Sequence, residues 1–264
     1  KGGSDFDPKG KSDFEVMKFC SAFMTELHKY IGPRMDITAG DIGVGAREIG
    51  FLFGEYKKIT SSYEGVLTGK PYMFGGSLMR PEATGYGVIY FTEKMLEIEK
   101  QEPLKGKICT VSGSGNVALH AIEKLQEIGA ITVSCSDSGG TLYDSRGVDV
   151  ALLKDLKLAR RLPLSEYLKT HPEAKYTPAS EYPEGSHAVW DIPCYAAFPC
   201  ATQNELSEID AQNLIANGCV SVSEGANMPS TPEAINALLS HKVYFAPAKA
   251  ANAGGVVVSS FEMS

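Results

Sequence analysis

The residues with the clearest chemical potential form the turn GSGNVA at positions 113–118, which fits the pattern G-x-G-x-x-A. A glycine at 113 permits a tight turn, and a glycine at 115 lets backbone N–H groups approach a pyrophosphate. The small Ala118 lets the following helix pack closely on the preceding strand. This spacing predicts a dinucleotide site, and the simpler alternative is a glycine turn that serves packing alone.

A second candidate site lies about 20 residues further on, where Asp137 ends the apolar stretch AITVSCSD. An aspartate in this place usually accepts a hydrogen bond from a ribose 2'-hydroxyl and would repel a 2'-phosphate. Ser138 and three basic residues that follow could hold that phosphate despite the aspartate: Lys157, Arg160 and Arg161. A solvated basic helix face is the alternative, and the sequence leaves both open.

Composition excludes several other kinds of chemistry. The six cysteines are scattered without a C-x-x-C pair, the five histidines are dispersed, and neither H-E-x-x-H nor a P-loop pattern occurs. We therefore expect no metal site and reduced cysteines in the core. The formal net charge of -7 disfavours nucleic-acid binding, and the absence of a long apolar run or a signal segment predicts no membrane association and a cytoplasmic location.

Two amphipathic helices are expected before residue 76. Ser12 and Glu15 have the spacing of a capping box. The first helix then repeats apolar residues at Val16, Phe19, Phe23, Leu27 and Tyr30, and the second at Ile49, Phe53, Tyr56 and Ile59. A loop with three glycines, DITAGDIGVG, joins them.

The amino-acid composition changes near Gly76, where glycine, proline and turn residues precede a long helical stretch over 81–100. Helices over 116–128 and 151–160 then alternate with the apolar segments KICTVSG, AITVSCSD, AAFPC and VSVSEGA. This alternation predicts an α/β fold with a mainly parallel, doubly wound sheet. We place one domain at 1–76 and a dinucleotide-binding domain at 77–264.

Several motifs together resemble those of glutamate dehydrogenases of the small hexameric class, over essentially the whole chain. They are KGGSDFDP, AGDIGVGAREIG, GVLTGK, RPEATGYG, PCATQNEL, EGANMP and AANAGGVVVS. The resemblance implies that 77–264 is a C-terminally incomplete Rossmann-type domain. It implies that 1–76 is part of the substrate-binding and oligomerisation domain, so that the chain is an internal piece.

The resemblance also implies roles for single residues. Lys1 matches the catalytic lysine, which activates water for attack on 2-iminoglutarate, and Asp41 matches the aspartate that moves protons to and from the substrate nitrogen. Without the resemblance, a solvated end is favoured for Lys1, and a helix N-cap is one alternative for Asp41. Gly40 and Ser259 match substrate contacts. The implied cofactor contacts are Thr84, Gly113, Ser114, Gly115, Asn116, Val117, Asp137, Ser138, Lys157, Asn227 and Asn252.

The activity implied is that of an oxidoreductase. It interconverts L-glutamate with 2-oxoglutarate and ammonia and prefers NADP to NAD, in a homo-oligomer that is a hexamer in the family. One alternative is a dehydrogenase for leucine or phenylalanine. Another is a piece that binds nucleotide without turnover, and we expect the 264 residues alone to be inactive.

Overall fold

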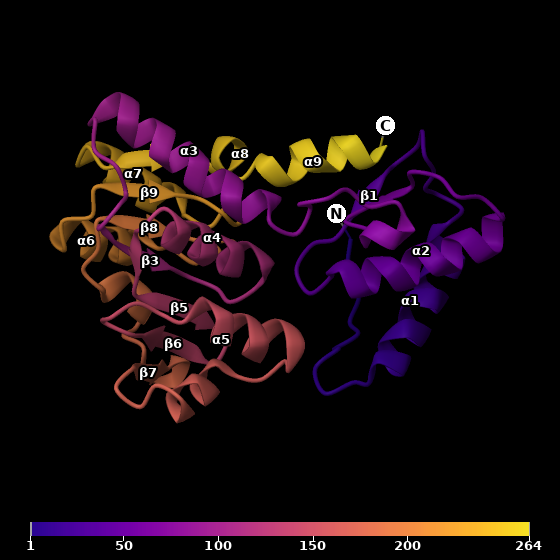
Figure 1. Ribbon diagram of the computed structural model, residues 1–264, viewed down its shortest axis with the longest axis horizontal. Helices are drawn as coiled ribbons and strands as arrows, with labels where there is room; N and C mark the ends of the chain where they lie inside the picture. Colours follow the sequence, from indigo (N-terminus) through magenta and orange to yellow (C-terminus); the bar gives the residue numbers. More distant parts are fainter. Residues whose placement is uncertain (1, 264) are drawn as a thin grey trace. The chain divides into compact units, whose positions relative to one another are not determined.

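The chain forms two compact units in the computed structural model, which describes residues 2–263 (Figure 1). One unit contains residues up to Arg80 together with 257–263, and the other contains Pro81–Val256. Helix α9 (Gly254–Met263) returns the chain to the first unit. A division of the chain at a single boundary near Gly76 does not include this return. The return is fixed by Glu262, whose carboxylate accepts the N–H groups of Gly69 (2.8 Å) and Lys70 (3.0 Å).

The first unit is built around two packed helices. Its elements are α1 (Asp13–Leu27), β1 (Thr38–Ala39), α2 (Ala46–Thr60), β2 (Leu67–Thr68) and the end of α9. Strands β1 and β2 pair in parallel. The predicted capping box is confirmed, because the Ser12 hydroxyl accepts the N–H of Glu15 while the Glu15 carboxylate accepts the N–H of Ser12. Met24, Phe53 and Leu67 meet in the small core of this unit.

The predicted apolar face of α1 is partly wrong. The buried residues of this helix follow a four-residue spacing: Val16, Cys20 and Met24. Phe23 and Tyr30 are exposed, and Phe19 stacks on Phe6 with 4.2 Å between ring centroids. Apolar residues occur all round this helix, so periodicity alone did not identify the stripe that faces α2.

The second unit is built on a five-stranded parallel sheet with the order β10-β9-β8-β3-β4. Its strands are β3 (Ile108–Val111), β4 (Ile131–Thr132), β8 (Ala196–Phe198), β9 (Ser221–Ser223) and β10 (Tyr244–Ala246). Figure 1 shows β9, β8 and β3 as neighbouring strands. The predicted α/β class with a Rossmann-type parallel sheet is confirmed.

Helices cover both faces of this sheet. They are α3 (Ala83–Glu99), α4 (Asn116–Glu127), α5 (Val150–Lys154), α6 (Glu208–Ala216), α7 (Pro232–Ser240) and α8 (Ala248–Ala251). Strand β8 shows the two faces, because Ala196 and Phe198 pack in the core with α3 and α4, while Ala197 packs in the core with α6 and α7. Alternate side chains of one strand thus pack in two different cores, as expected for a sheet that is buried on both faces.

A three-stranded antiparallel sheet, β5-β6-β7, was not predicted. Its strands are β5 (Ser134–Asp137), β6 (Gly140–Tyr143) and β7 (Lys175–Pro178). The stretch expected as one strand is divided at Val133 into β4 and β5, and β5 joins β6 through the two-residue turn Ser138-Gly139. The helix expected over 151–160 is α5 followed by a π-helical turn, Asp155–Ala159.

Two further sequence expectations concern cysteines and the membrane. All six cysteines are buried and unpaired, as predicted. Among residues 2–263, no helix has both the length and the apolar character required to cross a bilayer.

Candidate functional site

The predicted phosphate-binding turn follows β3 directly. Gly113 adopts φ +83°, a conformation that favours glycine, and its N–H donates to the Ser136 hydroxyl at 2.9 Å. A Cβ at this position would lie 2.8 Å from the carbonyl oxygen of Cys200. The turn therefore requires glycine both for its backbone angle and for its packing against the segment that follows β8.

Helix α4 begins as the motif predicts, with Gly115 as its N-cap and Asn116 as its first residue. Its first-turn N–H groups are the donors that a phosphate would accept from. Ser114 is buried, and Val117 is half-buried and packs against the hydrophobic core of this unit. The N-terminus of α4 thus combines its N–H donors with the small residues at 113–115.

Asn116 links this turn to the segment that precedes α3, because its side-chain amide donates to the carbonyl of Pro81. Thr84 is half-buried in the first turn of α3, three residues after Pro81. Tyr86 on the same helix donates to Glu123 of α4 at 2.8 Å. The structure therefore holds the start of α3, with Thr84, beside the start of α4.

Asp137 ends β5 and is held by three donors. Lys157 Nζ lies 2.8 Å from Oδ2, the N–H of Leu164 donates to the same oxygen at 3.3 Å, and the N–H of Gly139 donates to Oδ1 at 2.9 Å. Both side chains of the ion pair are mostly buried. Lys157 therefore does not belong to a solvated basic face, whereas Arg160 is exposed and pairs with Asp155 on its own turn. Ser138 is exposed beside this pair.

Asn227 and Asn252 are brought together from segments 25 residues apart. The Asn252 amide lies 3.4 Å from Asn227 Oδ1 and donates to the carbonyls of Gly225 and Ala226 at 3.3 Å. Asn227 is exposed and Asn252 half-buried.

The predicted cofactor contacts described above, except Lys157, lie in segments that follow β3, β5, β8, β9 or β10 or at the start of a helix beside these strands. Ligands of open α/β sheets bind outside the carboxyl ends of the parallel strands. Since β3, β8, β9 and β10 run in parallel, the loops after them lie at one edge of the sheet. This arrangement suits an elongated anionic ligand with a central phosphate group.

In the first unit, Gly40 and Asp41 follow β1 in an exposed turn closed by the N–H of Val44 donating to the carbonyl of Asp41 at 2.9 Å. A Cβ at Gly40 would lie within van der Waals overlap of the Val44 carbonyl oxygen. The alternative role of Asp41 as the N-cap of α2 is wrong, because Gly45 is the N-cap and its N–H donates to Glu48 at 2.8 Å.

Ser259 is buried on α9, one turn before Glu262. Glu262 lies 3.6 Å from Lys70 Nζ and 3.7 Å from Arg80 Nε, so this turn of the helix sits among cationic side chains. Lys1 lies outside the described residues.

Sequence reasoning missed three residues that shape the phosphate turn. Ser136 accepts from Gly113, Ser112 accepts from the N–H of Cys200 at 2.9 Å, and Glu205 accepts from the N–H groups of Ala201 and Thr202. Burial raises the pKa of Glu205 to about 7. The PCATQNEL motif contains Glu205, but no local pattern in the sequence marks this glutamate as buried.

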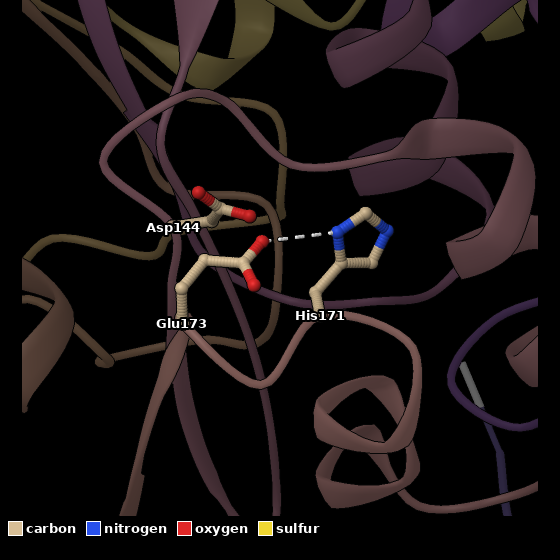
Figure 2. A group of neighbouring side chains, drawn as sticks. All are labelled: Asp144, His171 and Glu173. Carbon is tan, nitrogen blue, oxygen red and sulfur yellow. Dashed lines mark ion pairs between the residues drawn. The ribbon is translucent and has the colours of Figure 1, made fainter.

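A second cluster of polar side chains joins Asp144, His171 and Glu173, whose ligand atoms lie within 4.8 Å of one another. Figure 2 shows His171 Nδ1 facing Glu173, at 3.4 Å from Oε1. Arg146 contacts Glu173 and lies 3.8 Å from Asp144 Oδ1, so its cation already balances these carboxylates. The cluster is therefore explained as an ion-pair group beside β6 and β7.

Comparison with protein families gives two matches. Residues 75–264 match the Glutamate/Leucine/Phenylalanine/Valine dehydrogenase family, and residues 1–58 match the dimerisation domain of Glu/Leu/Phe/Val dehydrogenases.

Individual relatives agree with these matches. The NADP-specific glutamate dehydrogenase of Helicobacter pylori is 58% identical over 264 residues, which is 100% of this chain and 59% of the relative. The NAD(P)-specific glutamate dehydrogenase of Xylanibacter ruminicola is 53% identical, with 100% and 58% covered. The crystal structure of Plasmodium falciparum glutamate dehydrogenase matches with a TM-score of 0.89 and 49% identity, over 99% of this chain and 55% of that one. The chain thus spans less than two thirds of the length of these relatives.

Proposed function

Because this chain belongs to the Glutamate/Leucine/Phenylalanine/Valine dehydrogenase family, we propose that the protein containing it catalyses the oxidative deamination of L-glutamate to 2-oxoglutarate and ammonia, and the reverse reaction, with NADP. The observation that carries this proposal is the turn at Gly113, where backbone angle, packing and helix start together suit a pyrophosphate. The 58% identity with an NADP-specific glutamate dehydrogenase supports glutamate as the substrate.

The dinucleotide site uses the chain's own residues in distinct ways. The N–H groups at the start of α4 bind the pyrophosphate, and Thr84, Asn227 and Asn252 contact the rest of the dinucleotide. NADP, when bound, accepts a hydride from the α carbon of glutamate. The loops at the carboxyl edge of the sheet orient it for that purpose.

A preference for NADP over NAD is supported by the Asp137–Lys157 pair. Since Lys157 Nζ lies 2.8 Å from Asp137 Oδ2, the carboxylate that would repel a 2'-phosphate is neutralised within the protein. Its oxygens are also occupied by the N–H groups of Gly139 and Leu164. Lys157 and the exposed Ser138 are then the donors for the 2'-phosphate.

Proton movements at the substrate are assigned to Lys1 and Asp41. A lysine amine with its usual pKa near 10.4 is protonated at neutral pH, so a base at Lys1 requires enclosure or neighbouring charge. Asp41 follows β1 in an exposed turn, where it can accept and return the proton of the substrate nitrogen. Gly40 and Ser259 contact the substrate itself, with Ser259 at the distal carboxylate.

Assembly and location are proposed on the same basis. The match of residues 1–58 to a dimerisation domain supports a homo-oligomer, for which we propose a hexamer. The acidic net charge of -7 argues against nucleic acid as the partner and is compatible with small-molecule substrates. We propose a cytoplasmic location.

The test is a comparison of substrates with the full-length protein. We expect reduction of NADP to depend on L-glutamate and to be slow with L-leucine or L-phenylalanine at equal concentration. Reduction with NAD should need a higher cofactor concentration. Equal or faster turnover of L-leucine would contradict glutamate as the substrate and support the alternative amino-acid dehydrogenase.

A further inference from the structure

Glu205 is a buried carboxylate whose hydrogen-bond partners come from the loop before it. It is 5% exposed, and its Oε1 accepts the N–H of Ala201 at 2.8 Å and that of Thr202 at 3.2 Å. These partners are backbone N–H groups rather than a lysine or arginine. Burial of a carboxylate costs free energy, and hydrogen bonds to its oxygens offset part of that cost.

The segment that Glu205 fixes is the one that packs against the phosphate turn. A Cβ on Gly113 would lie 2.8 Å from Cys200 O and 3.0 Å from Ala201 Cα, so turn and loop are in backbone contact. Ser112, the residue before the turn, accepts the N–H of Cys200 at 2.9 Å. A shift of the backbone at 200–202 would therefore move the wall against which Gly113 is held.

The same loop is tied to the segment that carries Asn227. The N–H of Asn204 donates to Met228 O and the N–H of Leu206 donates to Pro229 O, both at 2.9 Å. The two neighbours of Glu205 in the chain thus bond to the 224–230 loop, while the Glu205 side chain bonds to residues 201 and 202. Glu205 therefore lies between the loop that contacts the Gly113 turn and the loop that carries Asn227.

We propose that Glu205 is a positioning residue for the dinucleotide, which fixes the backbone of residues 200–202 against the Gly113 turn and so holds that turn in its binding conformation. The inference rests on the proposed dinucleotide site and adds a residue outside the G-x-G-x-x-A motif to it. The property required is an acceptor oxygen at the position of Oε1. Glutamine supplies such an oxygen in the same place, whereas alanine supplies none.

The test measures the dissociation constant of NADPH for the full-length protein and its variants by titration. We expect Glu205→Ala to weaken NADPH binding by about tenfold or more, because two backbone donors lose their acceptor. Glu205→Gln should bind within about threefold of wild type. If the alanine variant does not fold, Glu205→Asp replaces it with the same expectation, because its carboxylate is withdrawn by about 1.5 Å.

The matched control is Asp144→Ala. Asp144 is also buried, at 2% exposed, and accepts a backbone N–H from Arg146 at 3.0 Å, but it lies at the end of β6 away from Asp137. This variant should keep the NADPH affinity within about threefold of wild type.

The outcomes separate this inference from the proposed function. Wild-type protein without NADPH affinity would overturn the dinucleotide site and this inference with it. Wild-type binding together with unchanged affinity in Glu205→Ala, or with equal losses in the alanine and glutamine variants, would overturn the positioning role alone. Equal losses in Asp144→Ala and Glu205→Ala would also overturn it, because any buried carboxylate would then have the same effect.

Discussion

Glu205→Gln should raise the stability of the folded protein above pH 7. Burial raises the pKa of Glu205 to about 7 from an ordinary value of 4.5. The native state therefore binds this proton more tightly than the unfolded state, and the native state holds more protons between pH 4.5 and 7. Stability contributed by the group is accordingly lost as the pH rises through that window.

The size of the effect follows from the two pKa values. The interval from 4.5 to about 7, at about 1.4 kcal/mol per pH unit, gives a cost of roughly 3 kcal/mol once Glu205 is ionised in the native state. Glutamine cannot ionise and keeps the acceptor oxygen for Ala201 and Thr202. The variant should therefore be more stable than wild type by up to about 3 kcal/mol at pH 8.5, and the two should converge within about 1 kcal/mol at pH 5.

Urea unfolding of the full-length protein across this pH range measures the difference. Trp190 is a suitable fluorescence reporter, because its indole N–H donates to the backbone carbonyl of Glu205 at 3.2 Å. The pH 5 comparison is the internal control, since wild-type Glu205 is then protonated and resembles glutamine in shape. Parallel pH profiles for wild type and variant would mean that ionisation of Glu205 does not destabilise the native state in this pH range.

The other predictions concern the proposed active site and its cofactor. Asp41→Asn should lower kcat by about a hundred- to ten-thousand-fold while the NADPH affinity stays near wild type, because an amide cannot carry the proton. Steady-state kinetics checks this, and a turnover above about a tenth of wild type would exclude proton transfer by Asp41. In the double variant with Lys1→Ala, the losses of activity should be strongly non-additive. Gly113→Ala should weaken NADPH binding about tenfold or more, since a Cβ would lie 2.8 Å from Cys200 O at φ +83°; titration with wild-type affinity would contradict this. Lys157→Met should raise the dissociation constant of NADPH about ten- to a hundred-fold and that of NADH much less, and equal changes for both nucleotides would be evidence against the 2'-phosphate contact.

Local patterns in the sequence predicted the elements whose cause is local. The capping box at Ser12 and Glu15 and the helix start at Asn116 depend on residues within four positions of one another, and both are present. The parallel sheet followed from the alternation of apolar strands with helices. These features require no knowledge of which distant segments meet.

The features that the sequence did not reveal depend on distant contacts. Lys157 meets Asp137 across 20 residues, and Glu262 bonds to Lys70 across 192 residues. The burial of Glu205 results from packing between the loops after β8 and β9, and the hairpin of β5 and β6 from a chain reversal at Ser138. Hydrophobic periodicity carries no information about such pairings, which explains why the antiparallel sheet and the return of α9 were missed.

Hydride transfer from glutamate to NADP, as proposed above, can be followed by isotope tracing. The full-length protein is incubated with L-glutamate deuterated at the α carbon and with NADP, and the reduced nucleotide is analysed by mass spectrometry and NMR. We expect each NADPH formed to carry one deuterium at C4 of the nicotinamide ring. NADPH without deuterium, or no reduction of NADP by glutamate, would contradict it.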